Sequence, residues 1–184
     1  MQLVQPTMAV MEISAPRRSY SFADIVDTHS SGIYKFCRSL TYSKEDAEDL
    51  FQETFLYAME QMPKITASGN PKSFLFSSTL YIWKSWKRKY ARRNRVAPTQ
   101  PLGETIPYGV SLEDNFMAKE DIRIIRQHVD ELPDKYKIPV LLYYTVEMGV
   151  ADIAESLSLP AGTIKSRLHK ARKLLEKGLK KIGY

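Results

Sequence analysis

The chain has 184 residues, and its 27 lysines and arginines against 21 aspartates and glutamates give a net charge of +6, with 43% hydrophobic residues. This composition is typical of a globular protein and excludes disordered and collagen-like classes. The longest apolar runs, 74–83 and 138–146, are about half of the ~20 residues that a membrane-spanning helix needs, and the N-terminus shows no signal-peptide pattern. We therefore expect a soluble, cytoplasmic protein.

The cysteine, histidine and glycine content excludes several kinds of site. A single cysteine, Cys37, leaves no intramolecular disulfide, and three scattered histidines leave no Cys/His metal framework. The eight glycines form neither of the common phosphate-binding motifs. We therefore expect no metal, no cofactor and no nucleotide-binding enzyme.

Charged residues are segregated along the chain. Residues 21–70 hold eight acids and four bases, residues 71–100 hold eight bases and no acid, and residues 160–184 hold eight bases and one acid. Two basic segments and one acidic segment predict two contacts with a polyanion and one contact with a different partner.

The first predicted elements are a tail and two helices. Residues 1–20 show no period, and we expect a flexible tail there. Ser21 with Asp24 forms an S-x-x-D pattern that predicts the start of a helix, and apolar residues recur at helical spacing after it. Ser43 with Asp46 repeats the pattern and predicts a second helix with its own buried stripe.

Two prolines predict helix boundaries in the next part of the chain. Pro63 is expected to end the second helix, which leaves a loop over 64–70. Asn70 then predicts an N-cap and Pro71 the first position of a longer helix, which runs through the basic segment to about Arg95.

A proline- and glycine-rich stretch over 96–110 has no apolar period and predicts an interdomain linker. After it, 112–132 and 133–148 are helical by pattern, and Pro139 is expected to bend the second of these. Because nothing alternates with period two, we expect an all-α fold of two small helical domains joined by a flexible linker.

Two helices near the C-terminus, 150–157 and 163–179, predict a helix-turn-helix. Small hydrogen-bonding side chains face away from the apolar stripe of the second helix and are flanked by cations, as in a recognition helix in the major groove. The alternative is a solvated basic helix on an unrelated bundle. The candidate DNA-binding residues are Thr163, Lys165, Ser166, Arg167, His169, Lys170 and Arg172.

The basic helix after Pro71 interleaves aromatic rings with cations. Rings can stack on unpaired bases, at roughly 1–3 kcal/mol per base, while cations follow the backbone, so this surface suits DNA that is being opened. The alternative is that Trp86 and Tyr90 form a buried stripe with Ile82, which Tyr81 and Trp83 cannot both share. The candidate DNA-binding residues are Asn70, Lys72, Tyr81, Trp83, Lys84, Lys87, Arg88 and Arg92.

The helix after Ser43 carries several carboxylates away from its buried stripe. An acidic face is usually only a solvated face. Clustered carboxylates also suggest a metal site or acid-base catalysis, but no calcium-binding loop or histidine ligand accompanies them. We therefore do not expect an enzyme.

Two segments, in this order, resemble parts of a known family. Residues 46–55 (DAEDLFQETF) resemble the core-polymerase-binding segment of sigma factors, and residues 162–172 (GTIKSRLHKAR) resemble the recognition helix of their region 4. Over residues 20–180 the chain resembles a bacterial extracytoplasmic-function (ECF) sigma factor, the minimal kind with regions 2 and 4 only. It departs from many members in the minus-ten helix, where Phe74 replaces a tryptophan.

The resemblance implies a role for each part. Residues 21–95 would be region 2, which binds core RNA polymerase and melts and recognises the minus-ten element with the loop 64–70 and the helix after it, holding a flipped-out base. Residues 111–184 would be region 4, which reads the minus-thirty-five element through the helix-turn-helix residues above. The residues implied for binding the polymerase clamp helices are Asp46, Asp49, Leu50, Gln52, Glu53 and Phe55.

The resemblance also implies partners. These are core RNA polymerase, promoter DNA and a cognate anti-sigma factor, commonly membrane-bound, which would hold the protein at the inner face of the membrane; the free chain would be a monomer. A stand-alone helix-turn-helix regulator is the alternative, and it would leave the acidic and the basic aromatic segments unused.

Overall fold

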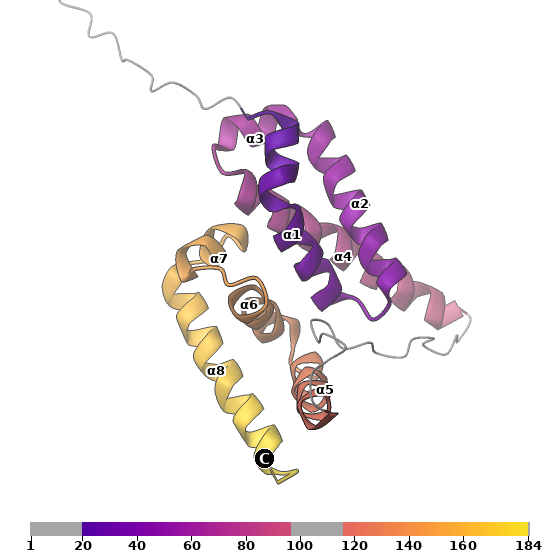
Figure 1. Cartoon of the computed structure of the whole chain (residues 1–184), viewed down its shortest axis with the longest axis vertical. Coiled ribbons are helices and arrows are strands. Elements are labelled where there is room, and N and C mark those ends of the chain that lie inside the picture. Colours follow the sequence, from indigo (N-terminus) through magenta and orange to yellow (C-terminus); the bar gives the residue numbers. More distant parts are fainter. Residues whose placement is uncertain (1–19, 97–115, 184) are drawn as a thin grey trace, which may run out of the picture.

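The computed structural model describes residues 20–96 and 116–183, and within these ranges the chain is all helical (Figure 1). This confirms the predicted all-α class. The helices are α1 (Phe22–Leu40), α2 (Lys44–Glu60), α3 (Met62–Ser68), α4 (Pro71–Val96), α5 (Phe116–Asp130), α6 (Asp134–Tyr144), α7 (Val150–Ser156) and α8 (Ala161–Lys180). Most of the predicted linker and the predicted tail lie outside the described residues.

The predicted N-caps mark where the helices begin. Ser43 Oγ accepts a hydrogen bond from the Asp46 N–H at 2.9 Å, and Asn70 Oδ1 accepts one from the Ser73 N–H at 3.0 Å. Ser21 precedes α1 as expected, but its side chain makes no capping bond. The capping patterns therefore located all three starts, and the bond itself forms at two of them.

The prediction that Pro63 ends the second helix is wrong. α2 already ends at Glu60, and Pro63 lies in the first turn of α3, where the missing N–H costs no helical bond. The expected loop over 64–70 is therefore mostly helical. The chain turns instead at Gly69, whose φ of 69° is left-handed and suits glycine.

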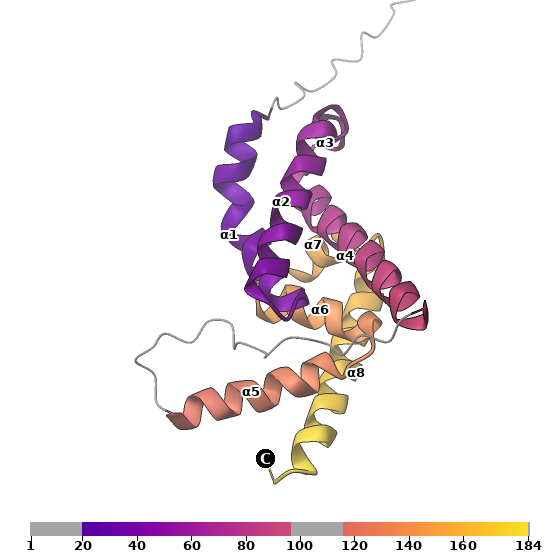
Figure 2. The same ribbon diagram turned by 90° about the vertical axis from the view of Figure 1, so that its right-hand side faces the viewer.

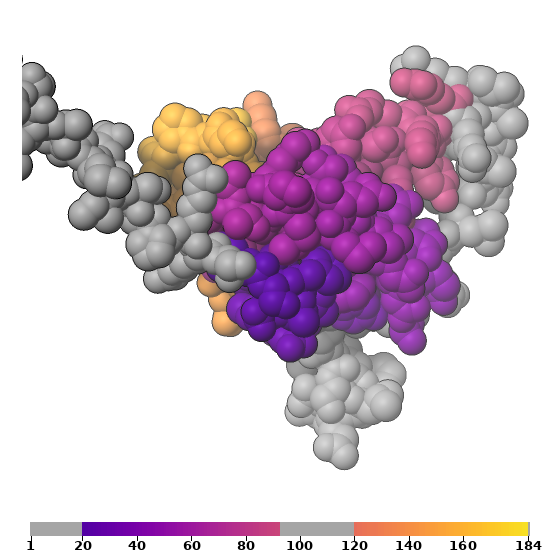
Figure 3. Space-filling model, turned by 90° about the horizontal axis from the view of Figure 1, so that it is seen from above, coloured from indigo at the N-terminus to yellow at the C-terminus, as the bar shows by residue number. Residues whose placement is uncertain are grey.

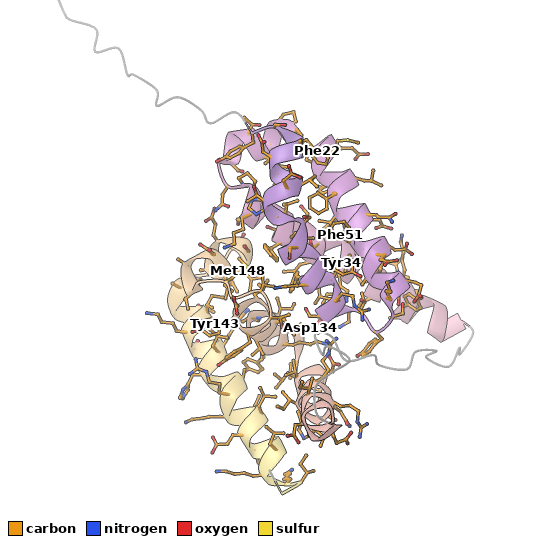
Figure 4. All side chains as sticks on the ribbon, viewed as in Figure 1. Phe22, Tyr34, Phe51, Asp134, Tyr143 and Met148 are labelled. Atoms are coloured by element: carbon orange, nitrogen blue, oxygen red, sulfur yellow. The ribbon has the colours of Figure 1, made fainter. Side chains whose placement is uncertain are left out.

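The N-terminal domain consists of α1 to α4. α1, α2 and α4 pack against one another around Phe36, Leu50 and Leu75, which are buried, and α3 packs on α4. Tyr34 of α1 and Phe51 of α2 meet edge to face with their ring centroids 5.7 Å apart. Both residues are labelled in Figure 4, where α1 and α2 lie side by side.

The C-terminal domain consists of α5 to α8. α8 packs against α5, α6 and α7, and the predicted apolar stripe is buried at Ile164, Leu168 and Ala171. The expected helix over 133–148 ends earlier, at Tyr144, and Pro139 lies buried inside it. α7 and α8 form the predicted helix-turn-helix, because a short turn joins them before Ala161.

The two domains lie against each other. α7 packs on α4 and α6 packs on α1. Figure 2 shows α6 and α7 beside the N-terminal helices, while α5 and the C-terminal half of α8 extend away from them. Among the described residues, no helix has the length and apolar character needed to cross a membrane.

Candidate nucleic-acid interface

The outward face of α2 combines acids with apolar side chains. Asp49, Gln52 and Glu53 are exposed, whereas Asp46 is half-buried. Two apolar neighbours of these residues, Leu56 and Met59, are 57% and 51% exposed. Of the two, Met59 is the one that sequence reasoning did not place on this face. Exposed apolar groups among acids are the combination expected of a surface that docks on another protein.

Two further candidate residues of this helix point into the core. Leu50 is fully buried and Phe55 is 8% exposed, so both hold the helix in place rather than offering a contact. At the edge of the face, Glu53 Oε2 accepts a hydrogen bond from Trp86 Nε1 at 3.1 Å, which connects α2 to α4.

Aromatic rings form a ladder between α2 and α4. Tyr57 stacks on Phe74 with ring centroids 6.2 Å apart and on Tyr81 at 6.4 Å. Tyr81 is 62% exposed, so its outer ring face is free to receive a flat ligand. Sequence reasoning missed Tyr57, because helical spacing within one segment says nothing of rings contributed by another.

Trp83 lies on the opposite side of α4 from this ladder. Its side chain is 6% exposed, and its Nε1 donates a hydrogen bond to the backbone oxygen of Leu40 at 3.1 Å. Lys87 Nζ lies over the Trp83 ring, 4.6 Å from its centroid. Of the two residues that could not share one stripe, Tyr81 is the exposed one and Trp83 belongs to the core.

The polar candidates on α4 fall into two groups. Lys84, Arg88 and Arg92 are exposed along the outer side of the helix. Asn70, Lys72 and Lys87 instead contact acids of the C-terminal domain: Asn70 with Glu155, Lys72 with Asp152, and Lys87 with Asp134.

The candidate residues of α8 lie together on its outer face. Lys165, Ser166, His169, Lys170 and Arg172 are exposed, and Thr163 and Arg167 are half-buried. A Cβ added at Gly162 would meet nothing within 4 Å, so no other part of the chain covers this side of the first turn of the helix. Ser166 Oγ donates to the Thr163 carbonyl at 2.9 Å, which leaves its oxygen lone pairs available as acceptors.

A cluster of charges is buried where α5 meets α6 and α1. Asp130 pairs with Lys137 Nζ at 2.5 Å and with Arg126 Nε at 3.2 Å. The Arg126 Nη2 also donates to the Ser39 carbonyl at 2.9 Å, at the C-terminal end of α1. These pairings satisfy the buried charges, as their burial requires.

Burial shifts the pKa values of two side chains in the N-terminal domain. Burial raises the pKa of the Cys37 thiol to about 12, so this thiol stays protonated. Burial, and then the nearby Lys72 charge, lower the pKa of His29. Among the described residues no group of three histidine, cysteine or acidic side chains gathers as metal ligands would.

An apolar groove opens between α5, α6 and α8. It has a volume of about 680 Å³ and is lined by Ile122, Ile125, Val129, Tyr144, Leu175 and Leu179 among others. Sequence reasoning did not predict it, because the groove arises from the angle between three helices.

Two family models match the chain. The model described as Sigma-70 region 2 matches residues 25–93, and that described as Sigma-70, region 4 matches residues 122–175. The ECF RNA polymerase sigma factor SigW of Bacillus subtilis is 32% identical over 169 residues, which cover 88% of this chain and 90% of SigW. The ECF RNA polymerase sigma factor SigL of Mycobacterium tuberculosis is 28% identical over 160 residues, or 86% of this chain and 89% of SigL.

A solved structure shares the fold. The sigma factor RpoE of Bartonella quintana, crystallised in complex with the anti-sigma factor NepR, is similar with a TM-score of 0.71 over 86% of this chain and 96% of the matched chain. Its sequence identity is 21%, so this likeness concerns the arrangement of helices.

Proposed function

The chain belongs to the ECF RNA polymerase sigma factors, and we propose that its domains, residues 21–95 and 111–184, divide the work of promoter recognition between them. One chain carries three separate surfaces: the acidic face of α2, the aromatic and basic side of α4, and the outer face of α8. This combination is the observation that carries the proposal, since each surface suits a different contact.

The α2 face would bind core RNA polymerase. Asp49, Gln52 and Glu53 present charge and hydrogen-bonding groups, and the neighbouring Leu56 and Met59 add apolar area that a partner can bury. Asp46 lies at the helix start, and the buried Leu50 and Phe55 fix the orientation of the helix. Complementary charge would steer the encounter and fix the register.

The outer side of α4 would open and read the minus-ten element. The exposed ring of Tyr81, backed by Tyr57 and Phe74, offers a platform for an unpaired base. Lys84, Arg88 and Arg92 continue along the helix as contacts for phosphates, and Asn70, Lys72 and Lys87 lie on the side that faces the other domain. The buried Trp83 would support the helix.

The outer face of α8 would read the minus-thirty-five element as duplex. Ser166, His169 and Lys170 point away from the buried stripe near the start of the helix, where base edges are reached in the major groove. Lys165, Arg167 and Arg172 flank them, with Thr163 at the first turn, and would hold phosphates.

Further parts of the proposal follow from this function. The protein would not be an enzyme itself, would act in the cytoplasm with the chromosome and polymerase, and would be a monomer when free. Because RpoE of Bartonella quintana was crystallised with an anti-sigma factor, we also propose such a partner for this chain. A stand-alone regulator is disfavoured because it leaves the α2 face and the α4 ladder without a role.

Reversing charge on α2 tests the polymerase contact. The double variant Asp49→Lys with Glu53→Lys should lower the affinity for core polymerase by about a hundredfold or more, because two attractive contacts become repulsive. Binding is measured with labelled protein by fluorescence anisotropy, and circular dichroism checks that helicity is retained.

The matched control is Asp27→Lys with Glu131→Lys, which makes the same charge change at exposed positions outside α2. This variant should bind nearly as well as the unchanged chain. If the α2 variant kept its affinity, or both variants lost it equally, the assignment of this face to the polymerase would be wrong.

A further inference from the structure

The groove between α5, α6 and α8 has no role in the proposed function. Its volume of about 680 Å³ falls within the roughly 300–1,000 Å³ of clefts that hold small ligands in proteins. Seen from the α3 end, most of the described surface belongs to the N-terminal helices (Figure 3). α5 and the C-terminal half of α8, which form two walls of the groove, extend from the opposite end of the molecule (Figure 2). All of its lining residues belong to the C-terminal domain.

The walls of the groove expose apolar side chains to solvent. Ile122 and Ile125 on α5 are 38% and 46% exposed, and Tyr144 at the end of α6 is 55% exposed. Leu175 and Leu179 of α8 line the groove as well and are half-buried. Contact of these side chains with water is unfavourable, so an apolar ligand that displaced the water would be bound favourably.

The charged side chains at the groove leave one positive charge uncompensated. Arg126 Nε lies 3.2 Å from Asp130 Oδ2. Lys180 Nζ lies 2.7 Å from Glu176 Oε1, so each of these two cations has its own carboxylate. Arg172 also lines the groove and is exposed, but it takes part in no ion pair among the described residues. An apolar cleft with one uncompensated guanidinium suits a ligand that has an apolar body and one anionic group.

We propose that this groove binds an anionic amphiphile, with its apolar body between α5 and α8 and its anionic group on Arg172. Arg172 also belongs to the outer face of α8, where the proposed function assigns it to a DNA phosphate. A carboxylate or sulfonate on Arg172 competes with that phosphate, because both anions take the same guanidinium donors. The ligand therefore weakens DNA binding by the C-terminal domain, and this second part of the inference rests on the proposed function of α8.

Two fluorescent probes that differ in one group test the binding site. Anilinonaphthalene sulfonate (ANS) carries an anionic sulfonate, and N-phenylnaphthylamine has the same aromatic body without it. We expect the full chain to bind both probes, and Ile125→Gln to weaken both about fivefold, because a polar amide replaces part of the apolar wall. Arg172→Gln should weaken ANS about fivefold and leave the neutral probe unaffected, because only ANS has a charge that pairs with the guanidinium.

The control is Met59→Gln, which makes the same kind of change at an exposed apolar residue of α2, outside the groove. It should bind both probes like the unchanged chain, and circular dichroism checks that all three variants keep their helices. Equal loss in Ile125→Gln and Met59→Gln would mean scattered binding to exposed apolar groups and would overturn the proposal. Unaltered ANS affinity in Arg172→Gln, or no ANS binding by the unchanged chain, would overturn it as well.

A pair of amphiphiles tests the effect on DNA. Dodecanoate, below the concentration at which it forms micelles, should displace ANS and lower the affinity of the full chain for a labelled mixed-sequence duplex about fivefold at low salt. Dodecyltrimethylammonium has the same chain with a cationic head group and should do neither. In Ile125→Gln, whose outer α8 face is unchanged, dodecanoate should lower DNA affinity much less. Equal effects of both amphiphiles, or of dodecanoate on both proteins, would contradict competition at Arg172.

Other occupants of the groove give different results. If ANS binding falls as the chain concentration rises, with a matching increase in mass by light scattering, a second copy covers the groove. If core polymerase displaces ANS and dodecanoate does not, the groove is a contact with that protein. Either result would overturn the proposal of an amphiphile site.

Failure of this inference is distinguishable from failure of the proposed function. Probe binding is measured without DNA or polymerase, and transcription is measured without amphiphile. If the probes do not bind the groove while the chain still directs promoter-specific transcription, only the amphiphile site is rejected. If the probes bind as described but no promoter-specific transcription occurs, the proposed function is rejected, and the effect on DNA binding loses its basis while the site itself stands.

Discussion

Lys170 and Lys177 lie two turns apart on α8, and both side chains are exposed. Lys170 lies in the half of the helix next to Ser166 and the open Gly162, where base edges would be within reach. Lys177 lies toward the far end, where only the phosphate backbone would be near. Under the proposed function, position along α8 would separate a base-reading cation from a phosphate-binding one.

Replacing each lysine by alanine tests this distinction. Lys170→Ala should lose about 1–3 kcal/mol of discrimination at one or two positions of the upstream element, whereas Lys177→Ala should weaken all sequences alike. The measurement is transcription with core polymerase from a promoter library randomised in that element. An equal loss on every sequence for Lys170→Ala would remove its base-reading role.

For single residues, the sequence limits which aromatic side chains can be buried together, but it does not decide which of them is buried. Spacing showed that Tyr81 and Trp83 could not share one buried stripe, but it did not say which would be buried. The answer depends on the Leu40 carbonyl, which accepts the Trp83 Nε1 hydrogen bond, and on Tyr57, which stacks on Tyr81. Both partners come from other helices, beyond the reach of local periodicity.

Among the elements, α1 packs on helices of both domains, as α4 also does. Gly32 lies at its middle, and a Cβ there would be 3.7 Å from Phe76 Cζ and 3.8 Å from Val146 Cγ1. Both distances are ordinary van der Waals contacts. A methyl group therefore fits between the domains, and a larger side chain does not.

Two substitutions at Gly32 separate these cases. Gly32→Ala should raise the free energy of unfolding by about 0.5–1 kcal/mol, because alanine is the better helix former, and should keep the chain compact. Gly32→Leu should instead push α6 away and raise the radius of gyration. Urea unfolding and small-angle X-ray scattering measure the two effects, with circular dichroism to confirm that the helices remain. Equal compactness of the two variants would contradict the described packing.

The starts of elements were more predictable than their ends. Ser43 and Asn70 predicted the starts of α2 and α4, because a side-chain cap is a local bond that the sequence alone can indicate. The prediction from Pro63 was wrong, because a proline can follow the end of one helix or lie in the first turn of the next. Because α2 already ends at Glu60, Pro63 lies in the first turn of α3.

Over the whole molecule, the closed arrangement of the domains is the feature that the sequence did not predict. Asn70 and Glu155 are 85 residues apart in the chain. The sequence marks Asn70 as a helix cap and a candidate DNA contact, but nothing in it connects Asn70 with Glu155. In Figure 4, Asp134 and Met148 lie on the side of the C-terminal domain nearest α1, while Tyr143 points away. The segregation of charge along the sequence predicted three surfaces, but not that acids of one domain would meet cations of the other.

The central claim is that this chain makes core RNA polymerase promoter-specific. The most direct measurement mixes the purified chain with core polymerase and maps the transcripts made from genomic fragments. We expect a one-to-one complex and transcripts with defined start points, each preceded by a common pair of sequence elements. Absence of a complex, together with a dimer that shifts duplex DNA unaided, would contradict the account and identify a stand-alone regulator instead.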